Sequence, residues 1–334
     1  MSTHADAATS SPDTPSPPAV APPGLPPMLA EPYIRFEQVL AVVFTIVPML
    51  ALTAAVPLVW GWGLSWLDVG LAVGFYLVSA LGVTVGYHRY FTHRAFTANR
   101  GLRNALAIAG SMSLQGDVIT WVADHRRHHV FTDREGDPHS PWLYGTGVAG
   151  LTRGFFHAHM GWLYDHDQTN AARFTPDLLA DPDIARISRQ FPIWTVVSLG
   201  VPALVGGLVT MSWWGALTAF FWAGLVRVSL LHHVTWSINS VCHMIGNRPF
   251  TARGKATNFW PLAILSMGES WHNLHHADPT CARHGVLRGQ LDMSARVIWI
   301  FERFGWATKV RWPKPARVAQ LQTAIPTGSP TSVE

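Results

Sequence analysis

Cysteine is nearly absent from this chain of 334 residues, which contains only Cys242 and Cys281. Two distant cysteines cannot build a disulfide framework, and they do not form the CxxC pair of a thiolate metal site. Any metal chemistry in this protein must therefore draw on other side chains.

Charge is scarce as well: 13% of the residues are charged, against 49% that are hydrophobic. An average soluble domain has about 25% charged residues, so the composition predicts a membrane protein. The sixteen tryptophans agree, because Trp favours membrane–water interfaces. The net charge of +4 does not indicate a nucleic-acid partner, since no run of Lys and Arg occurs that would track phosphates.

Long charge-free stretches predict four membrane-spanning helices. Gln38 to Leu67 is long enough for one helix and a turn at Gly61–Gly63, and Val69 to Tyr87 supplies a second. Gln190 to Val226 has room for two more, joined at Met211–Gly215. The predicted fold class is all-α integral membrane, with four transmembrane helices in two hairpins and a cytoplasmic helical cap.

Shorter segments complete the predicted organisation. Asn104 to Gly116 is apolar but too short to span, which favours an interfacial or re-entrant helix. Leu291 to Phe304 carries an apolar face of Leu291, Val297, Ile298, Phe301 and Phe304, typical of a helix on the membrane surface. Residues 1–33 are expected to be a disordered Pro-rich tail and 318–334 a disordered C-terminal tail, which leaves 34–317 as the folded domain.

Positive charge predicts the topology. Of the 24 Lys and Arg residues, eleven lie between Arg89 and Arg189, eleven between Arg248 and Arg317, and none in the two hairpin turns. By the positive-inside rule both polar segments and both termini face the cytoplasm, from a plasma membrane if the source is bacterial. Arg227 falls within the fourth span. The sequence leaves two roles open for it, a functional charge and a paired structural arginine.

What the chain does have is histidine in short clusters. HRYFTH, HRRHH and HNLHH together hold eight of the seventeen histidines. Imidazole binds first-row transition metals readily, so the clusters predict a metal centre. In HxxHH the positions i, i+3 and i+4 share one helix face, where three imidazoles are expected to converge. His88 and His93 are about 140° apart on an ideal α-helix, so each would serve a different metal unless the helix ends there.

Several motifs, in this order, resemble the integral-membrane fatty acyl desaturases of the acyl-CoA Δ9 (stearoyl-CoA) type. They are GYHRYFTH ending at His93, WVADHRRHH ending at His129, DPH at Asp137, RGFF at Arg153, HMGW ending at Trp162, NSVCHMIGNRP beginning at Asn239 and GESWHNLHH ending at His276. The resemblance covers about Phe36 to Trp312.

The resemblance implies two irons, with O₂ as co-substrate, and a cis double bond inserted into a long-chain saturated acyl-CoA. Nine neutral donors can give two ions four or five ligands each, while spacing alone admits Zn or Cu, so iron rests on the resemblance. Asn239 matches a position that reaches a metal through water. The implied ligands are His88, His93, His125, His128, His129, His243, His272, His275 and His276.

Further residues are assigned around this centre. By resemblance, a bent substrate tunnel is lined by Gln115, Trp121, Trp162, Thr235 and Trp236. Carboxylates close to ligands in sequence are expected to accept their second imidazole N–H: Asp124, Asp137, Glu269 and Asp278. The histidines expected to be structural, exposed or near the ligands are His139, His157, His159, His166 and His284, while His232 and His233 could line the substrate path or approach the metals.

Two departures from the family leave the acyl carrier open. Ala123 stands where animal relatives carry Arg, and Asp165-His166-Asp167 replaces a basic pair; both positions meet the CoA headgroup in relatives. No His-Pro-Gly-Gly haem motif occurs, so electrons would come from a separate cytoplasmic protein, such as an NAD(P)H-dependent reductase, a ferredoxin or a cytochrome b5. A membrane di-iron hydroxylase of lipids or alkanes is the nearest alternative, and a metal transporter is the non-enzyme one.

Overall fold

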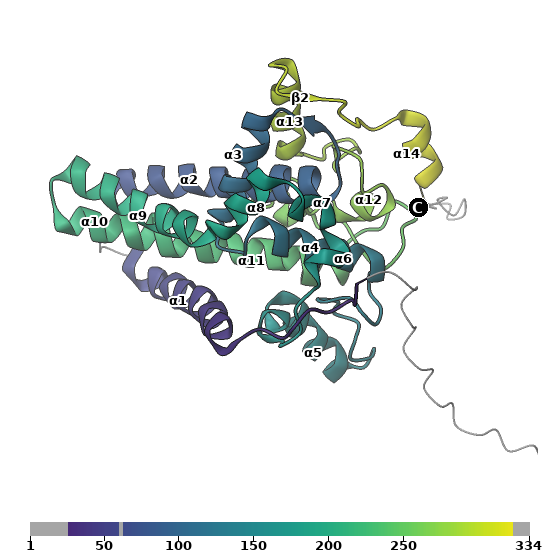
Figure 1. Cartoon of the computed structure of the whole chain (residues 1–334), viewed down its shortest axis with the longest axis horizontal. Coiled ribbons are helices and arrows are strands. Elements are labelled where there is room, and N and C mark those ends of the chain that lie inside the picture. Colours follow the sequence, from purple (N-terminus) through teal and green to yellow (C-terminus); the bar gives the residue numbers. More distant parts are fainter. Residues whose placement is uncertain (1–25, 60–62, 323–334) are drawn as a thin grey trace, which may run out of the picture.

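The computed structural model describes residues 26–59 and 63–322, and nearly all of its elements are helices (Figure 1). Four of the helices are long and apolar enough to cross a membrane: Arg35–Leu58, Trp66–Thr92, Phe191–Thr210 and Trp213–His243. They confirm the four predicted spans. The first predicted turn lies partly outside the described residues, since 60–62 belong to the undescribed part of the chain.

The second hairpin is a closely packed pair. Helix α9 (Phe191–Thr210) reverses at Met211, whose φ of 49° is left-handed, and Ser212 caps α10 (Trp213–Ala219). Gly206 lets the two helices touch, because a Cβ there would lie 2.4 Å from the carbonyl oxygen of Gly215. The fourth span then runs on as one rod through η3 (Phe220–Val226), α11 (Arg227–Ser240) and η4 (Val241–His243).

The first two spans lie on opposite sides of this rod (Figure 1). Helix α1 (Arg35–Val59) packs mainly against η3 and α11, whereas α2 (Trp66–Leu81) packs against η3, α9 and α10. Ser65 and Asp68 begin α2 with a capping box, in which each side chain accepts the other residue's backbone N–H. α2 continues without a break into η1 (Gly82–Thr92), a π-helix.

Arg227 is a structural clamp inside the fourth span. Its Nη2 donates to the carbonyl oxygen of Ser198 at 3.0 Å, and its Nη1 donates to that of Met112 at 3.2 Å. The buried guanidinium therefore ties α11 to α9 and to the segment after α3 (Arg100–Ser111). Pairing with carbonyls is how a charge is tolerated at such depth.

The cap, which is the helical part of the chain outside the four spans, surrounds a hydrophobic core at the inner end of the rod. This core includes Tyr87 of η1, Leu106 of α3, and Val122, Ile184 and Ile298 from three further helices whose bounds are given below. Strand β1 (Thr97–Ala98) pairs antiparallel with β2 (Ala307–Thr308) across the cap. Its other helices are α4 (Val118–Phe131), α5 (Val148–His159), η2 (Gly161–Tyr164), α6 (Ala171–Phe174), α7 (Pro176–Leu179), α8 (Pro182–Arg189), η5 (Trp260–Leu262), α12 (His272–Ala277), α13 (Met293–Arg303) and α14 (Pro315–Leu321).

The expected tail boundaries differ from the structure. Residues 26–33 are not free, because Ala30 N donates to the Gln168 carbonyl at 2.8 Å and Tyr33 N to that of His166 at 3.3 Å. At the other end α14 extends to Leu321, and Thr251 N donates to the Leu321 carbonyl at 2.8 Å. Residues 1–25 and 323–334 lie outside the described part of the chain.

Two shorter helices pack against the rest of the protein. α3 covers much of the segment predicted as an interfacial or re-entrant helix, and it lies against η1 and α2. In α13 Ile298 is fully buried in the cap core, with Val297 and Phe301 packed beside it, whereas Leu291 and Phe304 are 62% and 67% exposed. The middle of the predicted surface face therefore packs in the protein core, because an amphipathic stripe serves a core equally well.

Candidate metal centre

The nine predicted histidine ligands meet at the junction of the rod and the cap. They form two groups whose ligand nitrogens lie within 4.8 Å of one another. The first cluster has five members and the second has four, from η1 and the residue after it, α4, η4 and α12. The first cluster is His88, His93, His125, His129 and His275, and the second is His128, His243, His272 and His276.

Each HxxHH box is divided between the two clusters. In α4, His125 and His129 enter the first cluster and His128 the second. In α12 the division is reversed, with His275 in the first cluster and two residues in the second. The expected convergence of all three imidazoles is therefore wrong. Positions i and i+4 are about 40° apart on a helix, while i+3 lies about 60° to the other side.

His88 and His93 share the first cluster, which the prediction allowed only where the helix ends; η1 ends at Thr92, and His93 is its C-cap residue. The reason is the π-helix η1, in which His93 N donates to the His88 carbonyl, five residues back, at 3.2 Å. This wider turn stacks residues five apart, and the two ring centroids lie 4.9 Å from each other. The angle assumed from an ideal α-helix does not apply here.

The nitrogens within each cluster are arranged as ligands of a common ion. Adjacent Nε2 atoms of the first cluster are separated by 3.0 Å for His88–His275, 2.9 Å for His275–His129 and 3.1 Å for His129–His125. In the second cluster the separations are 3.1 Å for His272–His243, 3.0 Å for His276–His272 and 3.4 Å for His128–His276. The donor set therefore fits a pair of imidazole-bound metal ions.

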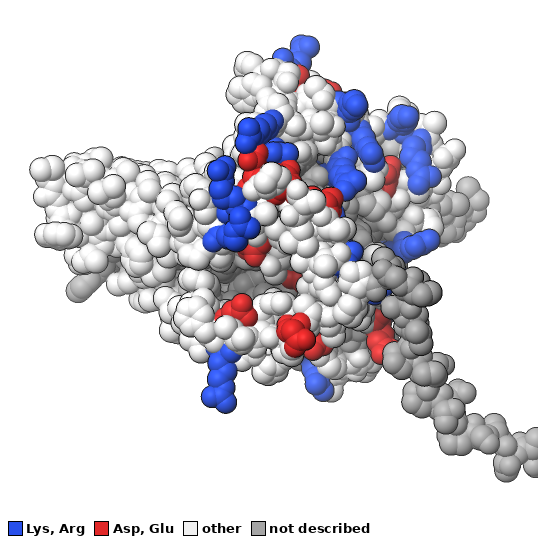
Figure 2. Space-filling model, in the orientation of Figure 1, with Lys and Arg blue, Asp and Glu red and all other residues white. Residues whose placement is uncertain are grey.

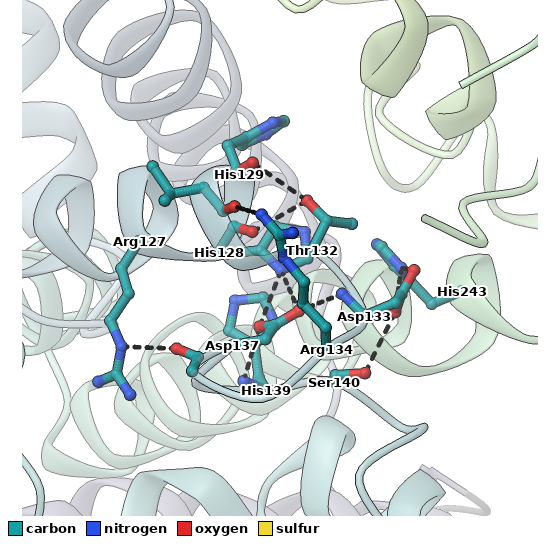
Figure 3. A network of polar contacts seen from close by, with 12 residues as sticks. Arg127, His128, His129, Thr132, Asp133, Arg134, Asp137, His139, Ser140 and His243 are labelled. Carbon is teal, nitrogen blue, oxygen red and sulfur yellow. Dashed lines mark hydrogen bonds and ion pairs between the residues drawn. The ribbon is translucent and has the colours of Figure 1, made fainter. Parts of the chain in front are cut away.

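Two aspartates orient the second cluster (Figure 3). Asp137 accepts from Nδ1 of His128 at 3.0 Å, and Asp133 accepts from Nδ1 of His243 at 3.1 Å. Because the proton sits on Nδ1, the Nε2 lone pair of each ring faces the cluster. Asp133 was not predicted from the sequence, although its position in the loop just after the HRRHH helix could have suggested it.

A buried ionic network supports the first cluster. Nδ1 of His88 lies 2.5 Å from Oε2 of Glu269, without the alignment of a hydrogen bond. Arg89 donates to Glu269 at 2.9 Å and contacts Asp292 at 3.0 Å. His284, expected to be structural, exposed or near the ligands, forms a further group with His88 and Glu269.

Burial sets the protonation of the ligands outside the spans. Desolvation and the neighbouring imidazoles hold the pKa of His125, His129 and His275 well below the usual value. These rings are therefore neutral at physiological pH, as metal binding requires. Burial works to raise the pKa of Glu269, but Arg89, His88 and His284 together outweigh it, and the pKa lies well below its usual range.

The comparison with known families decides what this arrangement is. The family model described as fatty acid desaturase matches residues 64–288, a region that carries all nine histidines. The chain belongs to the fatty acid desaturase family. One relative is the hex-5-enoyl-[acyl-carrier protein] acetylenase of Moorena producens (strain JHB). It is 39% identical to this chain over 81% of this chain and 85% of its own length.

Two further relatives differ in the carrier that their names give. An sn-1 stearoyl-lipid 9-desaturase of Anabaena variabilis is 34% identical over 74% of this chain and 85% of its own. A probable acyl-CoA desaturase of Schizosaccharomyces pombe is 34% identical over 71% of this chain and 47% of its own. These desaturases share a family and differ in their acyl carriers.

A cavity of about 550 Å³ leads to the metal site of this desaturase. All five predicted tunnel residues line it, as do Asn239 and the metal-cluster residue His125. Trp121 stacks on His125 with ring centroids 5.1 Å apart, and Gln115 donates to Thr235 at 3.0 Å. The predicted tunnel residues are Gln115, Trp121, Trp162, Thr235 and Trp236.

Not every expected residue reaches a ligand. Asp124 lines the cavity, where burial raises its pKa to about 6, and its hydrogen-bond partner is Thr169. Asp278 accepts from the Thr280 hydroxyl at 3.4 Å and is not among the cluster groups of the described residues. His233 bonds to His159 at 3.0 Å, and His232 lines the cavity.

Proposed function

We propose that this protein inserts a cis double bond at the Δ9 position of a long-chain saturated acyl group. The observation that carries the proposal is the pair of histidine clusters, the first of which meets, at His125, a cavity whose walls combine aromatic and apolar side chains with carboxylates. Its volume falls within the range of about 300–1,000 Å³ found for ligand cavities. Two substrate hydrogens, two electrons and two protons would reduce O₂ to two waters.

Iron is the proposed metal, two ions per chain. The nine imidazoles form a donor set that iron would accept, and zinc and copper also accept imidazole, so the choice of iron rests on membership of the desaturase family.

The side chains would position the substrate while bound iron supplies O₂ activation, which no amino acid offers. Trp121 packs on His125, so a chain that passes this indole lies beside the first cluster. The Gln115–Thr235 hydrogen bond ties the loop before α4 to α11 across the cavity. Such fixed walls would hold two neighbouring carbons in register with the metals.

The proposed setting is a membrane protein whose clusters and termini face the cytoplasm. The distribution of Lys and Arg supports this orientation. Electrons would come from a separate cytoplasmic donor, such as an NAD(P)H-dependent reductase, a ferredoxin or a cytochrome b5. The names of the relatives give three different acyl carriers: a lipid, the acyl-carrier protein and CoA. They therefore do not favour the acyl-CoA that the sequence resemblance implies.

Expression in a host without membrane desaturases, together with a compatible reductase, tests the reaction. We expect new cis-monoenes in the total fatty acids by mass spectrometry, two irons per chain, and neither product nor full iron content in His275→Ala. Hydroxylated fatty acids would instead support the lipid hydroxylase. Reversible metal uptake with no lipid product would support a transporter.

A further inference from the structure

The cavity that leads to the metal site is lined by carboxylates. Six acidic residues face it, and Arg127 is the one Lys or Arg among its described lining residues. Arg127 donates to the carbonyl of Gly136 at 2.8 Å and to the hydroxyl of Thr169 at 3.2 Å. The acidic lining residues are Glu37, Asp117, Asp124, Asp137, Asp165 and Asp167.

Three of these carboxylates, Glu37, Asp165 and Asp167, are exposed at the mouth. Their position is fixed because the segment before α1 pairs with the loop after η2, and Gln38 bonds to His166 at 2.6 Å. In Figure 2 acidic side chains border the hollow between the apolar rod and the cap. An anionic headgroup would meet repulsion at this entrance.

Three arginines of the cap are already paired with other carboxylates. Arg100 and Arg103 pair with Asp183 at 2.6 and 2.8 Å, and Arg126 pairs with Asp177 at 2.6 Å. These three guanidinium groups are thus held by carboxylates of α7 and α8. A polyphosphate would have to displace those pairs to use them.

The same entrance lies beside a membrane-spanning helix. Leu40, Ala41 and Phe44 of α1 line the cavity, while Val39 and Val43 of the same helix are 57% and 42% exposed. Helix α1 therefore separates the cavity from the surrounding lipid, and the mouth lies close to the membrane.

Four buried polar atoms of lining residues lack a hydrogen-bond partner within the described chain. They are Nε1 of Trp162, Nδ1 of His139, Nε2 of His157 and Nδ1 of His232. An indole N–H can only donate. It is suited to a carbonyl or hydroxyl oxygen of a ligand, such as an acyl ester or a sugar.

We infer that the acyl chain enters this cavity on a membrane lipid whose headgroup carries no net negative charge, and not on coenzyme A. This inference rests on the desaturase function proposed above. It names the substrate class: a diacyl lipid with a neutral, hydroxyl-bearing headgroup. The carboxylates of the mouth exclude anionic carriers and can accept hydrogen bonds from sugar hydroxyls.

The test compares carriers on the iron-loaded, full-length protein in nanodiscs with its reductase system. The substrates are stearoyl-containing monogalactosyldiacylglycerol, stearoyl-containing phosphatidylglycerol and stearoyl-CoA. We expect desaturation of the galactolipid to exceed that of both anionic substrates at least tenfold. Native mass spectrometry, with each ligand titrated onto the protein, should give the same order of binding without any need for turnover.

A second experiment removes the three carboxylates at the mouth of the cavity. Glu37→Gln/Asp165→Asn/Asp167→Asn should raise the use of stearoyl-CoA at least tenfold, while Glu135→Gln, an exposed carboxylate outside the cavity lining, should not. Added salt screens repulsion, so it should raise the use of stearoyl-CoA by the natural protein and leave the triple variant unchanged.

The outcomes separate the two proposals. Preferred use or tighter binding of stearoyl-CoA, or weaker CoA use at higher salt, would overturn the lipid-carrier inference and leave the desaturase intact. Equal use of galactolipid and phosphatidylglycerol would show that headgroup charge plays no part. Absence of a double bond from every substrate, with two irons bound, would count against the desaturase function itself, and the binding order would still decide the carrier.

Discussion

Aspartates that touch the histidines, and not those merely close in sequence, are expected to govern metal retention. Asp137 accepts hydrogen bonds from Nδ1 of His128 and from the backbone N–H groups of Asp133 and His139. Burial works to raise its pKa, but His128, His139 and the backbone N–H of Asp133 together outweigh burial and lower the pKa below the usual range. This carboxylate is therefore ionised and fixes both the tautomer and the direction of its histidine.

Asp137→Asn should weaken metal binding about 10- to 100-fold, the usual effect of losing such a partner. Iron retained against increasing chelator, measured by elemental analysis, tests this. Asp278→Asn is the matched control, because Asp278 contacts Thr280 and no cluster histidine. Equal retention by the two variants would contradict the role given to Asp137.

His159 makes the contact between α5 and α11 sensitive to acid. Its ring bonds to His233 and to Ser240, both at 3.0 Å. Burial, then the neighbouring His233, lowers the pKa of His159 to about 4. The unfolded chain, with a pKa near 6.5, binds the proton more readily, so stability falls as the pH drops from about 6.5 toward 4.

His159→Gln should therefore lose less thermal stability than the natural protein between pH 7 and pH 5. Glutamine keeps hydrogen-bonding capacity and has no charge to acquire. Melting temperatures of the solubilised protein measured across this range would show the difference. The exposed His166→Gln variant should retain the steeper natural slope, and an unchanged slope in His159→Gln would refute the assignment.

The π-helix η1 brings His88 and the residue after it, His93, into one histidine cluster and packs closely on α3. Gly82, its first residue, has no room for a side chain, since a Cβ would lie 2.2 Å from backbone atoms of Ala109 and Gly110. Gly110 in turn leaves space for the ring of Tyr87. The position of η1, and with it that of His88, depends on this contact.

Gly82→Ala should push α3 away, destabilise the protein by about 1–3 kcal/mol and reduce its iron content. Gly74→Ala in the same span is the control, because a Cβ there meets nothing within 4 Å. Thermal melting and metal analysis of both variants would test the contact. If Gly82→Ala behaved like Gly74→Ala, the close approach would not matter.

In the molecule as a whole, the apolar bundle of four spans ends in a charged cap. The histidine clusters lie where the bundle and the cap join. On the face shown in Figure 2, Lys and Arg are confined to the cap and its borders, and the far end of the rod carries none. Such polarity fits a protein inserted from one side of a membrane. Met211 and Trp213, 88% and 89% exposed, mark the far end.

Impermeant thiol labelling can locate the two ends. Cys242 and Cys281 are buried, so the natural protein should give little signal in intact cells. Trp213→Cys should be labelled from outside, and Glu135→Cys only after lysis. The reverse pattern would place the clusters outside the cytoplasm.

Charge-free stretches are enough to predict the four spans, and the three histidine clusters supply eight of the nine candidate ligands, while His243 followed from the family resemblance. A charge-free apolar stretch of sufficient length must lie in a bilayer or a core, wherever the rest of the chain goes. His125, His128 and His129 can likewise be recognised from the sequence. Their ability to bind metal belongs to the imidazole side chain, and their proximity follows from their spacing on one helix.

The division of these histidines between the two clusters depends on the three-dimensional structure. His88 and His93 meet because η1 is a π-helix, and the sequence pattern does not show that choice. Asp133 reaches His243, which is far away in the chain, while Asp124 beside His125 turns into the cavity instead. These contacts depend on helix type and on packing between distant segments, so local spacing could not reveal them.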